Sequence, residues 1–548
     1  MALGSVSPLA AQVSVLTQHN DNARTGLNAS ETLLTPANVN TNWFGKLFSQ
    51  PVNGPVYAQP LYVPNLAIPN QGTHNVVFVA TQHDSVYAFD ADTNAGTNAS
   101  PLWHDSFINP AAGITPVTVS SGDVGPDCTT FVGEIGIVGT PVIDAARGTL
   151  YVVALTKELT NKTYVLAQRL HALDITTGNE RSNSPVVIDA VVPGTGDGSS
   201  GGMVRFDPAR ELQRSGLLLA GGVVYIAWAS YCDNDPYHGW ILGYDPRTLA
   251  QVSAFNVTPN GSKGGIWMAG AGLSATADGT LYCVTGNGTF DTKANPTNFG
   301  DSFLKLQATN LTLLDYFTPF NQATLNSDDI DLGSGGAVLL PDSVGSVSHP
   351  HLLVGCSKEG KLYLLDRDNL GHYNAANDSQ IVQEFSLGST VFGLPAYFNG
   401  RLYVQALGQF LKAFAFSNGQ LNTTPVSQTT EQVTFRGTTP SISANGTTNG
   451  ILWLLAPEPP AGITTLRAYN ADNLSQKLYD SYTSMPANSS NQISFVKFVV
   501  PTIANGKVYV GTTDALAVFG LRAGKPRDKT PSTSRRNVIN CFARPSAL

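Results

Sequence analysis

A two-strand unit recurs eight times along this chain of 548 residues. Each copy has a Gly turn, an apolar strand with Tyr near its start, and a second strand that ends in an aromatic residue or Leu before a polar turn. The first strand is clearest in GTLYVVAL, GVVYIAWAS, GTLYCVTGN, GRLYVQAL and GKVYVGTTD, and the second in VYAFDADT, LHALDITTG, LGYDPRT, LYLLDRDN and LRAYNADN. Such a unit cannot bury its own apolar face, so it must stack on its neighbours.

The spacing of the units predicts their architecture. The second strands are anchored at Phe89, Leu173, Tyr244, Leu306, Leu365, Phe414, Tyr469 and Phe519. The later steps of roughly 50–60 residues suit a four-stranded propeller blade with modest loops. We therefore predict an all-β, eight-bladed β-propeller of four-stranded antiparallel blades. The wider early steps predict insertions between Asp105 and Glu134 and between Thr156 and Gln168.

The two ends of the chain predict how the ring closes. The last unit stops at Gly520 without a fourth strand, and WFGKLFSQP, from Trp43 to Pro51, offers one. We predict that this N-terminal strand completes the last blade and leaves no open edge. The alternative is a leading strand of a β-sandwich. The expected organisation is an N-terminal extension or strap over 1–42, the propeller over 43–521 and a basic tail over 522–548 that reads as disordered.

Composition and charge favour a secreted or periplasmic protein. Only 13% of the residues are charged, and no apolar run is long enough to span a membrane. The tail carries seven basic residues and one acidic residue, a net of +6, whereas the whole chain carries −8, so the remainder carries −14. An acidic body argues against nucleic acid as a partner. We expect an extracytoplasmic, monomeric protein without a membrane span.

The five cysteines are odd in number and scattered. No CxxC occurs, so a zinc site and an attached c-type haem are not expected. Cys128 and Cys232 both lie in long loops, and a bridge between them is one possibility. Cys283 and Cys356 lie in strand patterns typical of buried thiols.

Repeated strand-turn units that end in YxxDxxTG resemble the propeller of the pyrroloquinoline-quinone (PQQ) dehydrogenases and their non-catalytic relatives. The resemblance covers nearly the whole chain, from Trp43 to Leu521. It implies the propeller fold. It implies less about function, because the same repeat also builds scaffolds that bind no quinone.

In the catalytic members of that family, calcium lies at one mouth of the ring and takes oxygen ligands from the loops between the second and third strands of successive blades. The resemblance implies Asn287, in LYCVTGNGTFD, as the amide ligand. One blade earlier the family has a Glu ligand. The equivalent loop here is ASYCDNDPYHGW, which has no Glu and offers Asp233 and Asp235 instead. These three residues are the expected calcium ligands.

The resemblance also implies the catalytic and cofactor-binding residues. Asp331 in SDDIDLGSGG matches the base that accepts the alcohol proton. Lys358 in CSKEGKLYLLDR matches the cation that contacts the quinone, and Trp267 in GGIWMAG resembles the flat surface beneath it. A cation would polarise the quinone, and the redox chemistry would belong to the cofactor.

The sequence also departs from this family, and each candidate residue has a purely structural interpretation. The family's adjacent Cys-Cys pair is absent, and its Glu is replaced. Asn287 and Asp331 both suit turns beside Gly, and Lys358 suits a solvated hairpin. Trp267 suits packing between blades, and Asp233 with Asp235 suits a solvated loop or a structural calcium site.

Two functions therefore stay open. One is a non-catalytic or divergent PQQ-like propeller that presents one face to a protein, a glycan or a small molecule. The alternative is a quinoprotein oxidoreductase that uses calcium and PQQ to oxidise alcohols or sugars by proton abstraction and hydride transfer. The missing Cys pair favours the first. The convergence of Asp233, Asn287, Asp331 and Lys358 from three consecutive blades favours the second.

Overall fold

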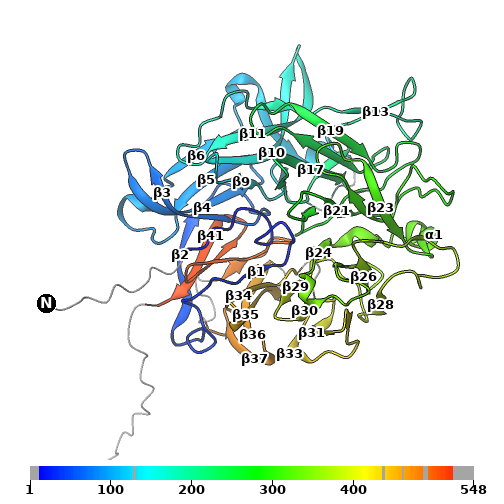
Figure 1. Ribbon diagram of the computed structural model, residues 1–548. Coiled ribbons are helices and arrows are strands. Elements are labelled where there is room, and N and C mark those ends of the chain that lie inside the picture. Colours follow the sequence, from blue (N-terminus) through cyan, green and yellow to red (C-terminus); the bar gives the residue numbers. More distant parts are fainter. Residues whose placement is uncertain are drawn as a thin grey trace, which may run out of the picture.

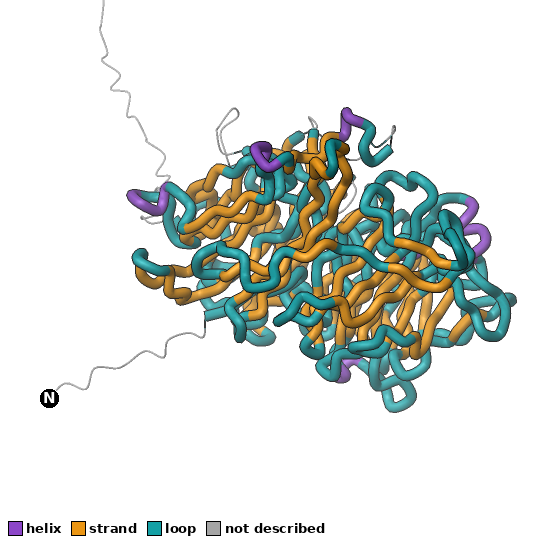
Figure 2. Tube along the Cα trace, turned by 90° about the horizontal axis from the view of Figure 1, so that it is seen from above, coloured by secondary structure: helices purple, strands orange, loops and turns teal. Residues whose placement is uncertain are grey.

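The structure is a computed structural model that describes residues 12–125, 128, 131, 133–434, 438–458, 462–484 and 492–522. Eight small sheets stand around a central axis (Figure 1). The view at right angles shows strands joined by loops, with helices confined to a few short segments (Figure 2). The eight-bladed, all-β propeller predicted from the repeats is confirmed. The basic tail beyond Arg522, which includes Cys541, lies outside the described residues.

Each blade runs from an inner strand at the axis to an outer strand at the rim. The first four blades are β3 (Leu61–Ile68), β4 (Gly72–Thr81), β5 (Ser85–Asp90), β6 (Trp103–Ser106); β9 (Val142–Asp144), β10 (Thr149–Thr160), β11 (Thr163–Asp174), β12 (Val186–Val187); β16 (Leu218–Ala220), β17 (Val223–Ser230), β18 (Trp240–Tyr244), β19 (Gln251–Asn256); and β20 (Ser274–Ala275), β21 (Leu281–Val284), β22 (Phe303–Leu306), β23 (Leu313–Thr318).

The remaining four blades follow the same order. They are β24 (Ala337–Leu339), β25 (Leu352–Cys356), β26 (Lys361–Asp366), β28 (Gln383–Ser386); β29 (Ala396–Phe398), β30 (Arg401–Val404), β31 (Gln409–Ser417), β33 (Ser427–Val433); β34 (Ser441–Asn445), β35 (Thr448–Glu458), β36 (Ile463–Asn470), β37 (Asn473–Asp480); and β39 (Thr502–Ala504), β40 (Lys507–Gly511), β41 (Ala515–Leu521), β2 (Phe44–Pro51). Within the described part of the chain, α1 (Gln322–Ser327) is the single α-helix.

The eight anchor residues form the core between blades. Each lies in the third strand of its blade, is at most 2% exposed, and pairs across the sheet with an apolar residue of the second strand. Leu173 opposite Leu150 and Phe519 opposite Val508 are examples. Because side chains alternate across a strand, this shared register turns the anchor face of every blade toward the preceding blade.

The N-terminal strand closes the ring. β2 pairs antiparallel with β41, from Phe44 opposite Leu521 to Pro51 opposite Ala515. Figure 1 shows the blue β2 beside the red β41. The predicted closure is confirmed, and the sandwich alternative is wrong.

Residues 13–31, here called the inner belt, run around the axis and pass the inner strand of each of the eight blades. Hydrogen bonds join the belt to one residue of each inner strand: Tyr62, Ile143, Leu219, Ala275, Leu339, Tyr397, Ile442 and Ile503. β1 (Leu27–Asn28) also pairs in parallel with β34. The belt thus uses the free edges of the inner strands, which would otherwise hold unpaired backbone groups.

The two early insertions differ in kind. Between Thr156 and Gln168 the second and third strands of blade 2 simply continue, so that β10 and β11 pair along their whole lengths to a turn at Asn161 and Lys162. Between Asp105 and Glu134 the chain adds β7 (Ile114–Thr118), which pairs with β10 and with β8 (Glu134–Ile135).

Candidate functional site

The loops after second strands and the segments that lead into inner strands meet at one face of the ring, here called the loop face. Asp233, Asn287 and Lys358 follow the second strands β17, β21 and β25. Trp267 and Asp331 precede the inner strands β20 and β24. In an antiparallel blade these two kinds of connection lie at the same end, which brings residues of blades 3 to 5 together.

An ion pair lies at the centre of this group. Lys358 Nζ donates to Asp331 Oδ2 at 3.0 Å, to Asp329 Oδ2 at 3.1 Å and to the Asp329 carbonyl at 2.8 Å. Burial lowers the pKa of Lys358, but Asp331 and Asp329 raise it by more, so the net shift is upward. Burial also raises the pKa of Asp331, and Lys358 opposes that rise. The ammonium therefore serves as the counterion of both carboxylates.

Asn287 is fixed against this pair. Its backbone N–H donates to Asp331 Oδ1 at 3.1 Å, and its Nδ2 donates to Asp329 Oδ1 at 2.8 Å. Gly286 allows the close approach, because a Cβ atom there would lie 2.3 Å from Asp331 Oδ1. The Asn287 Oδ1 atom is buried and has no hydrogen-bond partner among the described residues. One acceptor of the site is thus left open.

Asp233 contributes a further carboxylate from blade 3. Tyr237 Oη donates to its Oδ1 at 3.1 Å. Burial raises the pKa of Asp233, and the negative charges of Asp331 and Asp329 raise it further. Asp233 therefore lies within the electrostatic reach of the ion pair and adds to its negative field.

Trp267 borders the same site. A Cβ atom on Gly286 would lie 2.9 Å from Trp267 Nε1 and 2.3 Å from Asp331 Oδ1, so the indole and the carboxylate flank one glycine. The indole is partly exposed, and its Nε1 is buried without a partner in the described structure. The site thus contains a buried donor and a buried acceptor without partners in the described structure, Trp267 Nε1 and Asn287 Oδ1.

Asp235 does not join this group. Its side chain is 52% exposed, and its Oδ2 lies 3.8 Å from Lys263 Nζ. The turn after Cys232 directs Asp233 toward the ion pair and carries Asp235 out to solvent. A shared calcium site made by Asp233, Asp235 and Asn287 is therefore not formed.

Calcium does not fit the residues present. It needs six to eight oxygen ligands, with several carboxylates turned toward one point. Within the described ranges, no three His, Cys, Asp or Glu side chains gather in a way that could hold a metal ion. The two acids that lie closest are already bound to Lys358. An ammonium group here supplies the positive charge that a metal would bring.

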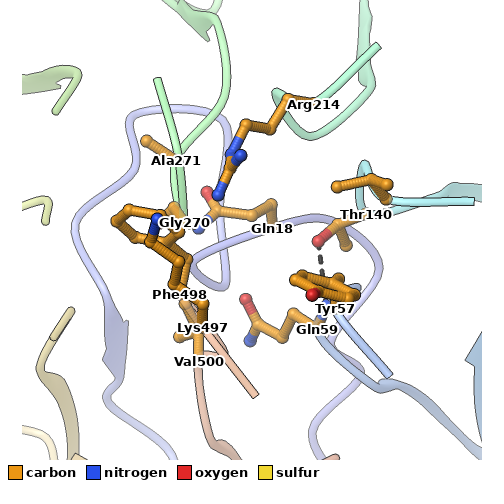
Figure 3. A pocket seen from close by; sticks show the side chains of 11 residues that line it. Gln18, Tyr57, Gln59, Thr140, Arg214, Gly270, Ala271, Lys497, Phe498 and Val500 are labelled. Atoms are coloured by element: carbon orange, nitrogen blue, oxygen red, sulfur yellow. Dashed lines mark hydrogen bonds between the residues drawn. The ribbon is translucent and has the colours of Figure 1, made fainter. Parts of the chain in front are cut away.

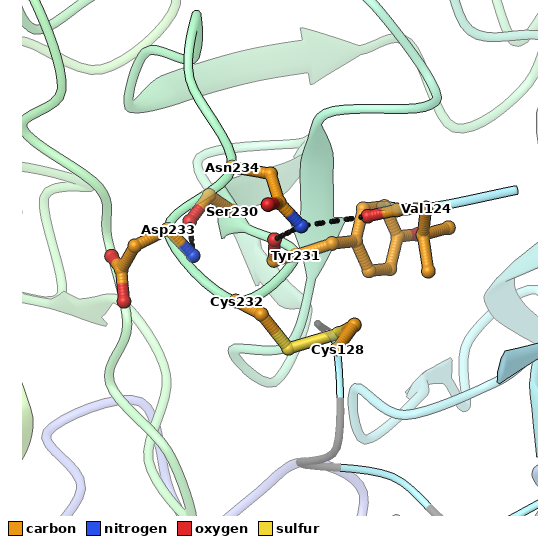
Figure 4. The surroundings of a disulfide bond; sticks show 7 residues. All are labelled: Val124, Cys128, Ser230, Tyr231, Cys232, Asp233 and Asn234. Carbon is orange, nitrogen blue, oxygen red and sulfur yellow. Dashed lines mark hydrogen bonds between the residues drawn. A yellow bond between two sulfur atoms is a disulfide. The ribbon is translucent and has the colours of Figure 1, made fainter. Parts of the chain in front are cut away.

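A disulfide fixes the loop that carries Asp233. Cys128 and Cys232 are bridged, so the possibility raised by their loop positions is confirmed (Figure 4). Asn234 Nδ2 donates to the Val124 carbonyl at 2.9 Å, which adds a second tie between the same segments. The Asp233 side chain points away from the sulfur atoms. Cys283 and Cys356 are buried free thiols, as expected.

Asp329 and Tyr237 were not predicted from the sequence. Asp329 lies two residues before Asp331 in SDDIDLGSGG, and its left-handed backbone, with φ of 57°, turns it toward Lys358. A run of three acids near one basic residue of the same blade was a usable signal for it. Tyr237 gave no signal beyond its position in the Asp233 loop.

Comparison with solved structures shows the fold. The chain resembles quinohemoprotein alcohol dehydrogenase ADHIIG from Pseudomonas putida HK5, with a TM-score of 0.55 and 14% identity over 97% of this chain and 82% of that one. It also resembles a europium-containing methanol dehydrogenase, with a TM-score of 0.57 and 12% identity over 93% and 98%. BamB from Moraxella catarrhalis has a TM-score of 0.47 and 13% identity over 87% and 99%. No protein-family model and no curated protein matches the sequence.

Proposed function

We propose that this protein is a non-catalytic, PQQ-like propeller that binds a polyhydroxylated small molecule or glycan at its loop face. The ion pair of Lys358 with Asp331 and Asp329 carries the proposal. Both carboxylate oxygens of Asp331 already accept hydrogen bonds within the protein, Oδ1 from the Asn287 amide and Oδ2 from Lys358. Proton abstraction assisted by calcium has no support from these contacts.

The chemistry around the ion pair suits hydroxyl groups. Sugars and polyols are recognised by a flat apolar surface together with a few fixed donors and acceptors. Trp267 offers a partly exposed indole, and its Nε1 donor and the Asn287 Oδ1 acceptor are buried without partners in the described structure. Asp233 adds a carboxylate that can accept from a hydroxyl group.

One observation favours the quinoprotein alternative. A buried amide oxygen without a partner, as in Asn287, is also what a cation ligand looks like before the cation binds. The folds of the two dehydrogenases agree with either function, since the fold does not fix the chemistry. We rank this alternative second because Lys358 would have to leave both carboxylates.

The disulfide supports an extracytoplasmic location for this binding function. Bridges such as Cys128–Cys232 persist in oxidising compartments. None of the helices in the described part of the chain has the length and apolar character of a membrane-spanning helix. The bridge supports a proposed location in the periplasm or outside the cell, and the monomeric state stays a prediction.

Titration with a panel of sugars and polyols, followed by calorimetry and tryptophan fluorescence, tests the proposal. We expect saturable binding to the native protein and at least a tenfold loss in both Trp267→Ala and Asn287→Ala, about the worth of one or two hydrogen bonds. Trp43→Ala, which removes an exposed indole on blade 8, is the matched control and should bind normally.

A second arm separates the two functions. The protein is mixed with calcium and PQQ, and dye-linked oxidation of the same alcohols and sugars is followed. Oxidation that is lost in Asp331→Asn would support the oxidoreductase and end the non-catalytic proposal. Absence of any saturable binding by the panel would also end it.

A further inference from the structure

A small cavity lies on the axis of the ring. Residues at the entry to the inner strands of blades 8, 1, 2, 3 and 4 line this axial cavity of about 20 Å³, together with Gln18 of the inner belt (Figure 3). The lining residues are Gln18, Tyr57, Gln59, Val138, Thr140, Arg214, Gly270, Ala271, Lys497, Phe498 and Val500. It contains two cationic side chains and no acidic one. The volume suits one or two waters or the head of one small anion.

Arg214 is the key residue of the cavity. It is only 7% exposed, and its side chain extends into the cavity in Figure 3. Its guanidinium carbon lies 4.5 Å from the ring centre of Phe498 and 5.7 Å from that of Phe131. Burial lowers the pKa of Arg214 to about 10, so it stays charged at neutral pH.

This guanidinium has no anionic partner among the described residues. Tyr57 is the one group whose charge raises the pKa of Arg214, in opposition to burial. Aromatic rings contact the guanidinium, but its N–H donors point outward in its own plane. A largely buried charge without a counterion is costly, and such charges are normally paired.

We propose that the axial cavity is a binding site for the carboxylate group of a small organic acid, held by Arg214. A planar carboxylate matches the fork of a guanidinium and would accept two parallel hydrogen bonds. The aromatic rings beside Arg214 lower the local dielectric and strengthen this pairing. Gln59, Thr140 and Tyr57 supply polar groups around the anion, and Lys497 adds positive charge to the wall.

This site is separate from the proposed polyol site. The axial cavity is basic and draws on blades 8 and 1 to 4, whereas the Lys358 site is acidic and draws on blades 3 to 5. No lining residue of the cavity belongs to the ion pair. Binding of an anion at Arg214 should therefore be the same in Trp267→Ala.

Calorimetric titration of the full chain with sodium acetate at constant ionic strength tests the site. We expect saturable one-to-one binding and a loss of roughly 10–100-fold in Arg214→Gln, the worth of charge-assisted hydrogen bonds. Arg205→Gln is the matched control, because it removes the same charge from a side chain that is 65% exposed. Chloride, which cannot make the two parallel contacts, should bind more weakly than acetate.

Arg214→Lys covers the case in which Arg214→Gln fails to fold. It keeps the positive charge and loses the fork, so acetate binding should weaken by about tenfold. Equal acetate binding in the native protein and Arg214→Lys would overturn the proposal. So would no saturable binding, or an equal loss in Arg205→Gln, since the latter indicates a general effect of charge.

Discussion

At the scale of single residues, the loop face contains ionisable side chains that are buried, and Asp84 is one of them. Asp84 lies in the turn after β4, the blade 1 counterpart of the turn that holds Lys358 in blade 5. It is 1% exposed, and neither carboxylate oxygen has a well-formed hydrogen-bond partner in the described structure. Burial raises its pKa well above the ordinary value, and Glu134 raises it further. The amides of Leu155 and Ile137 offset this only in part.

Asp84 should therefore make stability depend on pH. Its folded-state pKa is raised, so the folded protein holds this proton more tightly than the unfolded chain. The favourable effect is complete below about pH 4 and is lost as the pH rises toward the folded-state pKa. We expect Asp84→Asn to gain stability relative to the native protein between pH 4 and pH 8, by more than about 1 kcal/mol. Urea unfolding at several pH values measures this, and a constant difference would contradict it.

The sequence predicts where these residues lie along the strands and loops, but not which side chains make contact. The positions of Asn287, Lys358 and Asp331 followed from the order of strands and turns, because loops at one end of antiparallel blades must meet. The ion pair with Asp329 depended on one left-handed residue and on side-chain geometry, and no repeat pattern encodes either. Arg214 gave no signal, because its lack of an acidic partner is a property of the folded chain.

The inner belt shows at the element scale how a segment with no repeat can tie eight repeats together. Arg24 in the belt is fully buried, and burial lowers its pKa to about 10, so it remains charged. Its Nε donates to the Leu273 carbonyl at 2.8 Å, and its Nη2 donates to the Leu217 carbonyl at 3.3 Å. Nη1 donates to the Gln18 carbonyl at 2.6 Å. One side chain thus connects the belt to blades 3 and 4.

Removal of this side chain should destabilise the protein strongly. Arg24→Ala leaves several buried carbonyl groups without donors, at about 1–3 kcal/mol each, so we expect a loss of at least about 3 kcal/mol. The free energy of unfolding in urea measures it. Arg205→Ala, on an exposed arginine, should change stability by less than about 0.5 kcal/mol. Equal effects of the two substitutions would show that the belt contributes little.

Strands were predictable from the sequence where a short apolar segment lies between Gly turns, and less predictable where their residues are polar. The anchors from Phe89 to Phe519 mark third strands because an apolar strand between Gly turns is a local signal. The segment between Thr156 and Gln168 reads as an insertion because its polar residues break the pattern. In the structure it prolongs β10 and β11, since backbone pairing across a two-residue turn does not require apolar side chains.

At the scale of the whole molecule, closure joins two segments more than 450 positions apart. Phe44 of β2 is fully buried, and its ring centre lies 5.4 Å from that of Trp453, 4.9 Å from Tyr479 and 6.4 Å from Phe519. Trp453 and Tyr479 belong to blade 7, so this one side chain also packs the closing strand against the neighbouring blade. The closure was predictable because a ring with seven complete blades and one incomplete blade exposes an edge.

Phe44→Ala should therefore weaken the whole ring rather than one strand. Loss of a buried Phe costs about 3–5 kcal/mol, and we expect fluorescence and far-UV circular dichroism to report the same lowered urea midpoint, since the blades are held in one closed circle. The adjacent Trp43→Ala is the matched control: its side chain is 36% exposed, and its backbone carbonyl still accepts from the Arg522 amide. It should cost less than about 1 kcal/mol. A Phe44→Ala protein that keeps its midpoint, or loses signal in two separate steps, would show that β2 covers blade 8 without holding the ring together.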